Sequence, residues 1–492
     1  MGKPIIYQLL PRLWGEGRMS SIDTLSLEYF KSLGVTHVWY TGLIRHSSGQ
    51  PFTKGHPGSP YAISDYYDIN PYLADNEEER MAEFESLVKR THEAGLRLVL
   101  DFVPNHVGRD YGRHRVRTDI AYLGDGDDDT THWKAENDFY YYPGETLRLP
   151  NGTCFAEYPA KATGNRFSPA PDRDDWYDTV KLNYCPFHTG TWDKMRDILL
   201  FWAARGVDAF RCDMVELVPR EFFQWAIAEV RKQFPDIKFI AEVYQKENYQ
   251  QWTDAGFDWL YDKSGLYDCL RAIVETQASP ASDGHASARG ITANWQFLGG
   301  LQPRMLNFLE NHDEQRFASP YFGGDGARTF APLAVSLLLN TAPFLLYSGE
   351  ECGERAAGSD NGRTTIFNAA KIPSLQHLWA WIHTGEGLQP EESRLLARFR
   401  DMLSLASDPA FAEGVTFDLG YCNGPADGFD PDRHFAFLRS GGGHTYLVFC
   451  NFSRTPARAS LTIPEHAASL GIRPGRLTVQ AGPSDASIIE YP

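Results

Sequence analysis

The sequence predicts an α/β protein, a (β/α)₈ barrel with a small domain inserted after the third strand and a C-terminal all-β sandwich domain. Eight short apolar runs alternate with helical patterns, and each run is continuous, as parallel strands buried on both faces should be. Eight strand–helix units in series favour a barrel over a doubly wound sheet. The expected division is barrel for 1–107 and 191–405, inserted domain for 108–190 and β-sandwich for 406–492.

The expected barrel strands are, in chain order, IIYQLL, THVWYTGL, LRLVLDFV, VDAFRCDM, KFIAEVY, FDWLYD, RMLNFLE and PFLLYSG. Expected helices between them include DTLSLEYFKSLG, NEEERMAEFESLVKRTHEAG and PREFFQWAIAEVRKQF. Gly34 and Gly95 follow two of these patterns, where glycine commonly terminates a helix. Pro219 suits the first turn of the third.

The connection between the third strand and the helix WDKMRDILLFWAARG holds roughly eighty residues, which is too long for a structureless loop. Its clusters of Tyr, Pro, Gly and Asp predict an irregular small domain over the C-terminal mouth of the barrel. Near the C-terminus, HFAFLRSGGGHTYLVFCNF predicts a β-hairpin, followed by the strands ARASLTI, GRLTVQ and ASIIEY. The apolar stretch FAPLAVSLLLNTAPFLLY predicts a buried helix and then a buried strand, because prolines, Asn and Thr interrupt it.

Composition excludes several functions. The chain has 492 residues, with 47 basic and 64 acidic side chains and a net charge of −17, which opposes binding to nucleic acid or to an anionic membrane. Its seven cysteines include no CxxC pair, so we expect free thiols in a reducing compartment rather than zinc or redox sites. The N-terminal apolar run is too short for a signal peptide, and we expect a cytoplasmic protein. Oligomeric state stays open.

Carboxylates gather where the expected strands end, which is where barrel enzymes keep their reacting groups. The strand-end residues are Asp101, His106, Arg211, Asp213, Glu242, Glu310, His312 and Asp313. Any one of these acids alone could be a buried ion pair, such as Asp101 with Arg211. Several acids converging on one cavity repel each other, so that one is held protonated while others stay ionised. Glycoside hydrolysis needs such a pair, a carboxylic acid for the leaving oxygen and a carboxylate for the sugar carbon.

The motifs DFVPNH, GVDAFRCD, FIAEVY and FLENHD resemble, in order and spacing, the four signature regions of the α-amylase family, glycoside hydrolase family 13. SPYAISDYYDINP, VKLNY and GRTTIF resemble further segments of that family. The resemblance covers essentially the whole chain. It implies that the insertion is the family's domain B and that the C-terminal β-sandwich is its domain C.

The resemblance also implies roles for individual residues. Asp213 matches the nucleophile, Glu242 the general acid/base and Asp313 the second acid that binds sugar hydroxyls. Four further residues match substrate-binding positions of the family. His106 and His312 match donors to sugar hydroxyls, and Tyr61 matches an aromatic platform beneath the sugar. Arg211 matches the arginine that keeps the nucleophile ionised.

Two departures from the family pattern bear on function. Calcium-dependent members carry a ligating His four residues after the nucleophile, where this chain has Leu217, although the ligand Asn105 is present. We therefore expect no metal site and no required cofactor, and leave structural calcium open at the alternating Asp125, Asp127 and Asp129. Gly58 replaces the Asp that exo-acting α-glucosidases often carry, which favours an open cleft.

The resulting expectation is a retaining, α-amylase-like glycoside hydrolase that acts on α-1,4-glucans such as starch, or on maltooligosaccharides, through a covalent glycosyl-enzyme. One alternative is a transglycosylase or isomerase that uses the same nucleophile. Another is a non-catalytic carbohydrate-binding relative, which loss of an acid would signal, whereas all three acids are present.

Overall fold

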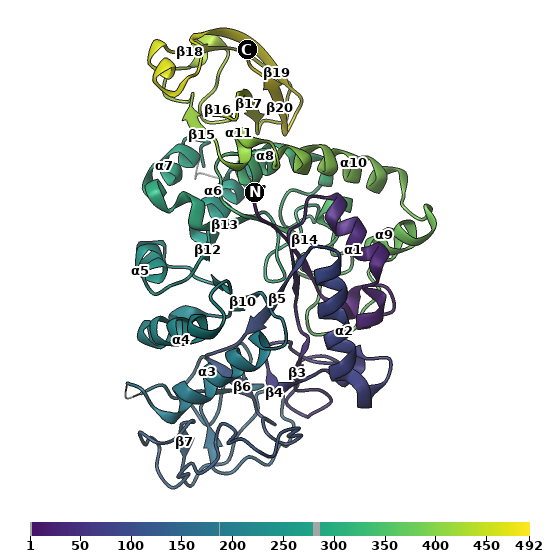
Figure 1. The fold of residues 1–492 in the computed structure, drawn as a ribbon, viewed down its shortest axis with the longest axis vertical. Helices are drawn as coiled ribbons and strands as arrows, with labels where there is room; N and C mark the ends of the chain where they lie inside the picture. Colours follow the sequence, from purple (N-terminus) through teal and green to yellow (C-terminus); the bar gives the residue numbers. More distant parts are fainter. Residues whose placement is uncertain (1, 186, 279–285) are drawn as a thin grey trace.

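A computed structural model describes residues 2–185, 187–278 and 286–492, and its centre is a closed barrel of eight parallel strands (Figure 1). All eight expected strands are confirmed, and each pairs with the next barrel strand in the chain until the last closes on the first. Their bounds are β1 Ile5–Leu9, β2 His37–Tyr40, β5 Arg97–Phe102, β10 Ala209–Cys212, β11 Lys238–Ala241, β12 Trp259–Tyr261, β13 Met305–Phe308 and β14 Phe344–Tyr347.

Helices surround the barrel at the expected places. Their bounds are α1 Thr24–Ser32, α2 Arg80–Glu93, α3 Gly190–Ala203, α4 Arg220–Gln233, α5 Tyr249–Asp254, α6 Asp268–Ala278, α7 Arg289–Leu298, α8 Phe330–Leu338, α9 Pro373–Thr384 and α10 Pro390–Leu405. Gly34 and Gly95 follow α1 and α2 with φ of +79° and +77°, the left-handed conformation that glycine adopts without strain. Pro219 lies one residue outside α4, as its N-cap.

Each barrel strand contributes one side chain to an apolar layer inside the barrel: Ile6, Trp39, Val99, Ala209, Ile240, Tyr261, Leu306 and Leu345. Because side chains alternate along a strand, the residue two positions further points inward again, one layer nearer the C-terminal mouth. For β5, β10 and β11 those residues are Asp101, Arg211 and Glu242. Because of this alternation, the layer of charged side chains lies directly above the apolar layer inside the barrel.

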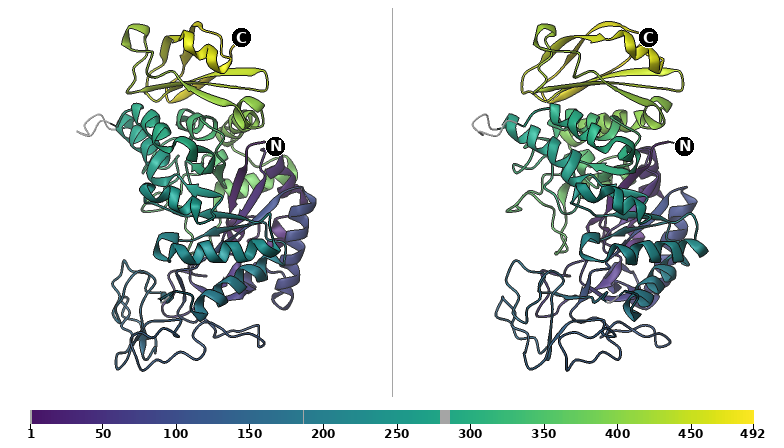
Figure 2. Two further views of the ribbon diagram at one scale, coloured as in Figure 1. Left: turned by 60° about the vertical axis from the view of Figure 1, so that its left-hand side comes forward. Right: turned by 90° about the vertical axis from the view of Figure 1, so that its left-hand side faces the viewer.

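The segment between β5 and α3 forms little regular structure. Strand β6 (His106–Gly108) pairs with β9 (Thr179–Lys181), and β7 (Tyr141–Tyr142) with β8 (Ala160–Lys161), all antiparallel. Further toward the N-terminus, β3 (Ile44–His46) pairs with β4 (Ile63–Ile69). A small apolar cluster that includes Leu147, Leu149 and Ala160 packs on Phe52. Figure 2 shows this segment at the opposite end of the molecule from the C-terminal β-structure. The division at 108–190 and at 406 stays a prediction.

The C-terminal region is all-β after the short helix α11 (Pro409–Ala412). Strands β15 (Val415–Asp418), β16 (His434–Gly441), β17 (His444–Asn451) and β20 (Asp485–Glu490) form one antiparallel sheet, and β18 (Ala457–Ile463) pairs with β19 (Gly475–Ala481). Both sheets contribute to one apolar core, so the expected sandwich is present. The expected glycine turn joins β16 to β17 at Gly442 and Gly443, both with positive φ.

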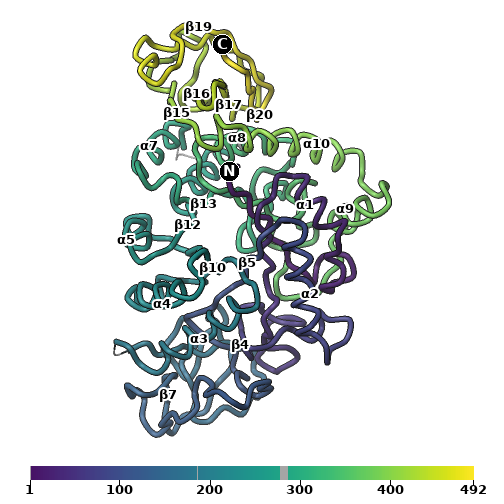
Figure 3. Tube along the Cα trace, viewed as in Figure 1, coloured from purple at the N-terminus to yellow at the C-terminus, as the bar shows by residue number. Residues whose placement is uncertain are grey.

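Two buried basic side chains join this sandwich and the N-terminus to the barrel. Arg439 of β16 donates to the carbonyl of Phe411 at 2.9 Å and to Leu339 just beyond α8 at 3.4 Å. Lys3 donates to the carbonyl oxygens of Leu337 and Asn340, also at the end of α8. These donors satisfy carbonyl oxygens at the helix C-terminus, which lack partners within the helix. Figure 3 shows the N-terminus beside α8 and α10, under the sandwich.

Across the described ranges, none of the helices combines the length and the apolar character that crossing a membrane would require.

Candidate active site

One buried arginine organises the mouth of the barrel. The Arg211 guanidinium lies 2.8 Å from Asp213 Oδ1, 2.9 Å from Glu242 Oε2 and 3.6 Å from Asp101 Oδ1. Arg211 is completely buried, and the register of β10 and β5 places it directly opposite Asp101. The Trp39 indole donates to the other Asp101 oxygen at 3.0 Å. Three carboxylates thus share one permanent positive charge, and the cluster carries surplus negative charge.

Burial, with a smaller contribution from the neighbouring carboxylates, sets the proton affinity of the acids. Burial raises the pKa of Asp213 to about 6, against the lowering effect of Arg211. Burial also raises the pKa of Glu242 to about 7, with Arg211 again opposing and the neighbouring Asp213 and Asp313 adding to the rise. A charge on Asp213 makes ionisation of Glu242 less favourable, so near neutral pH Glu242 holds a proton more readily than Asp213 does. An acid and an ionised carboxylate side by side are what acid–base work on a substrate requires.

Glu242 is held by two groups that sequence reasoning missed. The backbone N–H of Met214 donates to Oε2 at 2.8 Å, and the hydroxyl of Tyr244 donates to Oε1 at 2.9 Å. Met214 has φ of +44°, a left-handed conformation uncommon for a residue with a side chain. No motif in the sequence signals that conformation, whereas Tyr244 lies in FIAEVY itself, two residues after the acid.

The predicted residues Tyr61, His312 and Asp313 lie together at the same mouth. The Tyr61 hydroxyl is 2.5 Å from His312 Nε2, and the two rings stack with centroids 5.3 Å apart. His312 Nε2 is also 3.1 Å from Asp313 Oδ2, while the Gln8 amide nitrogen contacts Nδ1 at 2.8 Å. Burial lowers the pKa of His312 to about 4, so the ring is neutral. Asp313 keeps 40% of its side chain exposed, which leaves its carboxylate open to a ligand.

His106 is the last of the predicted site residues at this mouth. Its ring makes a hydrogen bond to the backbone of Tyr61 and lies 5.2 Å from the Trp176 ring. The Asn105 side-chain nitrogen contacts His106 Nδ1 at 3.1 Å, and burial lowers the pKa of His106 to about 3. The structure therefore links all seven predicted site residues through contacts at one mouth.

Glu310, the remaining acid at a strand end, has partners of its own. Arg316 contacts it at 3.0 Å, and the backbone N–H of Phe317 donates to it at 2.7 Å. These contacts make it the buried ion pair that was the alternative interpretation for each acid.

The residues at the family's calcium position do not fit a calcium ion. The ammonium of Lys181, on β9, donates to Asn105 Oδ1 and, at 3.0 Å, to the carbonyl of Leu217. A positive charge from the chain itself thus lies between the two oxygens that would face a metal. Burial lowers the pKa of Lys181 to about 8.

The alternating acidic loop does not fit calcium either. Asp125 is paired with Arg115 at 2.6 Å. Asp127 accepts the backbone N–H groups of Asp138 and Phe139 at 2.9 and 3.1 Å. In the described part of the chain, no three His, Cys, Asp or Glu side chains are grouped to hold a metal. The carboxylates of Asp125 and Asp127 stabilise the loop itself.

Gly58 has a steric reason to be glycine. Its φ is +111°, and a Cβ built there would lie 2.4 Å from the carbonyl oxygen of Ser47. An aspartate at this position would need a different backbone, so the group that often marks exo-acting relatives is sterically excluded here.

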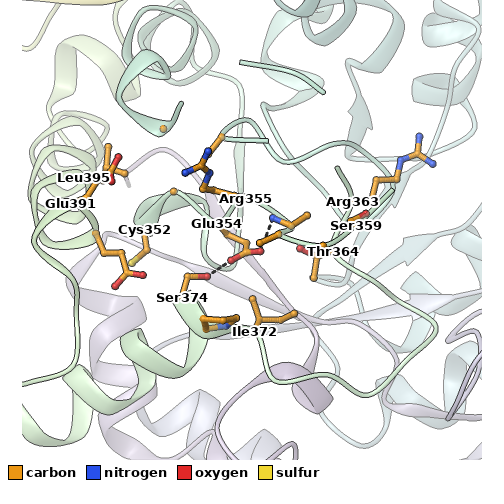
Figure 4. A pocket seen from close by; sticks show the side chains of 18 of the residues that line it. Cys352, Glu354, Arg355, Ser359, Arg363, Thr364, Ile372, Ser374, Glu391 and Leu395 are labelled. Atoms are coloured by element: carbon orange, nitrogen blue, oxygen red, sulfur yellow. Dashed lines mark hydrogen bonds between the residues drawn. The ribbon is translucent and has the colours of Figure 1, made fainter. Parts of the chain in front are cut away.

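A separate cavity of about 880 Å³ lies between the loop after β14, the segment that precedes α8 and the N-terminal ends of α9 and α10. Figure 4 shows Glu354 and Ser374 hydrogen-bonded within it, with Arg355 and Arg363 nearby. None of the seven predicted site residues lines this cavity.

The fold is a closed parallel barrel with acids at its strand ends, and one buried guanidinium bridges two of these acids. These features define the class of barrel enzymes that work through paired carboxylates. The chain belongs to the α-amylase family: the family described as "Alpha amylase, catalytic domain" matches residues 15–377.

Individual relatives are distant. The α-amylase MalA of Haloarcula japonica is 24% identical over 488 residues, covering 98% of this chain and 60% of the relative. An α-1,4-glucan:maltose-1-phosphate maltosyltransferase of Cereibacter sphaeroides is 28% identical over 431 residues, covering 80% of this chain and 52% of the relative. The chain thus spans about half to three fifths of the length of these curated relatives. The crystal structure of the maltogenic α-amylase AmyB of Thermotoga neapolitana shares the fold, with a TM-score of 0.64, 22% identity and coverage of 99% of this chain and 96% of that one.

Proposed function

We propose that this protein is a retaining glycoside hydrolase that cleaves α-1,4-glucans or maltooligosaccharides through a covalent glycosyl-enzyme. The observation that carries the proposal is the bridge from Arg211 to both Asp213 and Glu242, at 2.8 and 2.9 Å. Two carboxylates bound to one guanidinium lie close together, and closely spaced carboxylates are typical of retaining rather than inverting glycosidases.

The first chemical step uses both acids. An Asp213 oxygen attacks the anomeric carbon, the bond from that carbon to the leaving oxygen breaks, and Glu242 gives its proton to that oxygen. Arg211 keeps Asp213 ionised and oriented for the attack. The products of this step are a β-linked glycosyl ester on Asp213, the shortened sugar chain and an ionised Glu242.

The second step reverses the proton movement. Glu242 takes a proton from water, the water oxygen bonds to the anomeric carbon, and the ester bond to Asp213 breaks. We assign Asp313, His312 and His106 to binding the sugar hydroxyls, because Asp313 acts on both acids, His312 contacts Asp313, and His106 contacts the backbone of Tyr61 at the same mouth. Tyr61 provides an aromatic surface beneath the sugar, with its ring fixed by stacking on His312.

A sugar acceptor could replace water in the second step, which gives a transglycosylase as the second candidate. The maltosyltransferase similarity favours keeping it, because that relative is named for transfer rather than hydrolysis. Chromatography of products from maltoheptaose, with and without added glucose, separates the two. Longer products that incorporate the glucose would identify transfer, and shorter products alone would identify hydrolysis.

Proton NMR of the first products provides the direct test of the retaining mechanism. Two displacements at the anomeric carbon should give an initial α-anomer from an α-linked substrate, read before mutarotation. An initial β-anomer would contradict the role of Asp213. Pullulan, amylopectin, sucrose and trehalose tested alongside maltoheptaose would define the linkage, and absence of turnover on all of them would contradict the proposed function.

We also propose that activity needs no calcium, because the Lys181 ammonium occupies the position between Asn105 and Leu217. Dialysis against EDTA should leave activity and Tm unchanged. Lys181→Met should lower stability by about 1.5–3 kcal/mol, the usual contribution of hydrogen bonds to a charged group, because Lys181 is partly buried. Lys134→Met is the matched control, since Lys134 pairs with Asp128 at the surface. Loss of activity in EDTA that Ca²⁺ restores would contradict this proposal.

A further inference from the structure

The geometry assigns the catalytic proton to one oxygen of Glu242, Oε1, and makes Tyr244 the positioning residue that holds this oxygen in both of its protonation states. The inference deepens the proposed function and rests on it. It concerns which carboxyl oxygen faces the leaving group.

The two oxygens of Glu242 have different surroundings. Oε2 faces the Met214 backbone N–H at 2.8 Å and the Arg211 guanidinium at 2.9 Å. Both partners are donors only and cannot accept a hydrogen bond. A proton on Oε2 would therefore point at other protons and displace one of these contacts. Oε2 is thus the oxygen that stays unprotonated throughout the cycle.

Oε1 has a partner that can change role. Tyr244 lies 2.9 Å from it, and a phenolic hydroxyl can either donate or accept. When Glu242 is ionised, Tyr244 donates to Oε1. When Glu242 is protonated, the Oε1 hydroxyl donates to Tyr244 until the leaving oxygen takes the proton. Each proton transfer thus requires the Oε1 proton to turn between Tyr244 and the sugar oxygen and the Tyr244 hydroxyl to rotate, and no non-hydrogen atom needs to move.

The position of Tyr244 is itself fixed by the loop after the nucleophile. The carboxylate of Glu216 accepts the backbone N–H groups of Tyr244 and Gln245, both at 3.0 Å. Glu216 lies three residues after Asp213. The loop that follows the nucleophile therefore contacts the acid directly through Met214 and indirectly through Tyr244, which couples the positions of the two catalytic groups.

The test variant is Tyr244→Phe, which removes only the hydroxyl. On maltooligosaccharides we expect kcat/KM to fall roughly tenfold, part of the about 10²–10⁴-fold that general acid–base catalysis supplies. On an aryl maltoside with a dinitrophenol leaving group, kcat/KM should change about twofold or less, because that leaving group needs little protonation. A merely structural role would lower kcat/KM equally on both substrates.

The pH profile gives a second readout. The Tyr244 hydroxyl bonds more strongly to the carboxylate than to the acid, so its loss should move the alkaline limb of kcat/KM upward, by up to about one pH unit. Arg211, Asp213, Asp313 and Asp101 also face Glu242, and all four remain in the variant.

Tyr249→Phe is the matched control, because its buried hydroxyl bonds Asp262 at 3.3 Å and not the acid cluster. Tyr249→Phe should change neither the alkaline limb of the pH profile nor the dependence of kcat/KM on the leaving group. Should Tyr244→Phe fail to fold, Tyr244→Met, which also lacks a hydroxyl, takes its place in both measurements. The inference would be overturned if Tyr244→Phe lowered kcat/KM equally on both substrates and left the alkaline limb of the pH profile unchanged. The proposed function would still hold in that case, provided that the wild type turns over maltoheptaose. An inactive wild type would overturn the proposed function instead.

Discussion

Asp213→Asn should abolish turnover and leave the protein folded. The nucleophile forms the covalent bond to sugar, and an amide cannot replace a carboxylate in that step. The asparagine oxygen can still accept from Arg211, which now contacts Asp213 at 2.8 Å, so the local geometry is expected to persist. Steady-state assays on maltoheptaose test this. If the variant kept more than about a hundredth of wild-type kcat, the nucleophile role would be contradicted. A decrease that small is no larger than the decrease caused by removing a general acid or base.

The same variant should be more stable than the wild type at neutral pH. Because the folded-state pKa of Asp213 is about 6, above the ordinary 3.8, the folded protein prefers the protonated acid. That preference stabilises the wild type below about pH 4 and is lost as the pH rises through 6. Asparagine cannot ionise, so the stability of the variant relative to the wild type should rise between pH 4 and 6, by about 1–3 kcal/mol.

Asp262→Asn is the control for turnover, and it should show the same rise in relative stability between pH 4 and 6. Asp262 is also a buried acid beside a barrel strand end, with a pKa that burial raises to about 6, but it bonds Asn294 and Tyr249 rather than Arg211. It should retain turnover. Thermal unfolding monitored at several pH values, for the wild type and both variants, separates loss of chemistry from loss of fold. A variant of Asp213 that unfolds more easily at pH 7 would contradict the stability argument.

Much of the fold could be predicted because its signals are local. Strands buried on both faces must be apolar throughout, so IIYQLL or PFLLYSG is visible without any knowledge of its neighbours. The acids could be found for the same reason, since Asp101 and Glu242 interrupt or end such runs where a charge is costly. Each is two residues beyond a core side chain, Val99 and Ile240, and the alternation of the strand fixes the direction in which it points.

What could not be predicted depends on contacts between distant segments. Lys181 lies in VKLNY, but its position near Asn105 follows from the pairing of β9 with β6, some seventy residues apart in the chain. The Met214 N–H points at Glu242 because the backbone of Met214 is left-handed, and no turn motif in the sequence predicts that conformation. Glu310 shows the opposite case: its local pattern is that of an active-site acid, and only Arg316 and Phe317 reveal a structural role.

The second large effect expected is that of Glu242→Gln on substrates with different leaving groups. Glutamine fits the site, because its carbonyl oxygen can replace Oε2, accept from the Met214 N–H and face the Arg211 guanidinium, while its amide group donates to the Tyr244 hydroxyl in place of Oε1. The variant should fold and bind substrate. It cannot deliver a proton, so kcat/KM on maltooligosaccharides should fall by about 10²–10⁴-fold.

An aryl maltoside with a dinitrophenol leaving group should lose far less, because that group departs without protonation. The alkaline limb of the wild-type profile, which follows the Glu242 pKa of about 7, should disappear in the variant. Azide, an anion that needs no general base, should speed the second step and yield an α-glycosyl azide, because its attack inverts the β-linked ester on Asp213.

Glu310→Gln is the matched control. Both Glu310 oxygens accept, one from Arg316 and one from the Phe317 N–H, so the amide nitrogen must face a donor and the variant should lose stability. Because Glu310 lies outside the acid pair bridged by Arg211, its leaving-group dependence should match the wild type. Equal losses on both substrates for Glu242→Gln, with the alkaline limb retained, would show that another group carries the proton. Glu242 would then be a structural partner of Arg211, and the chemistry would have to be reassigned among the acids that remain around it.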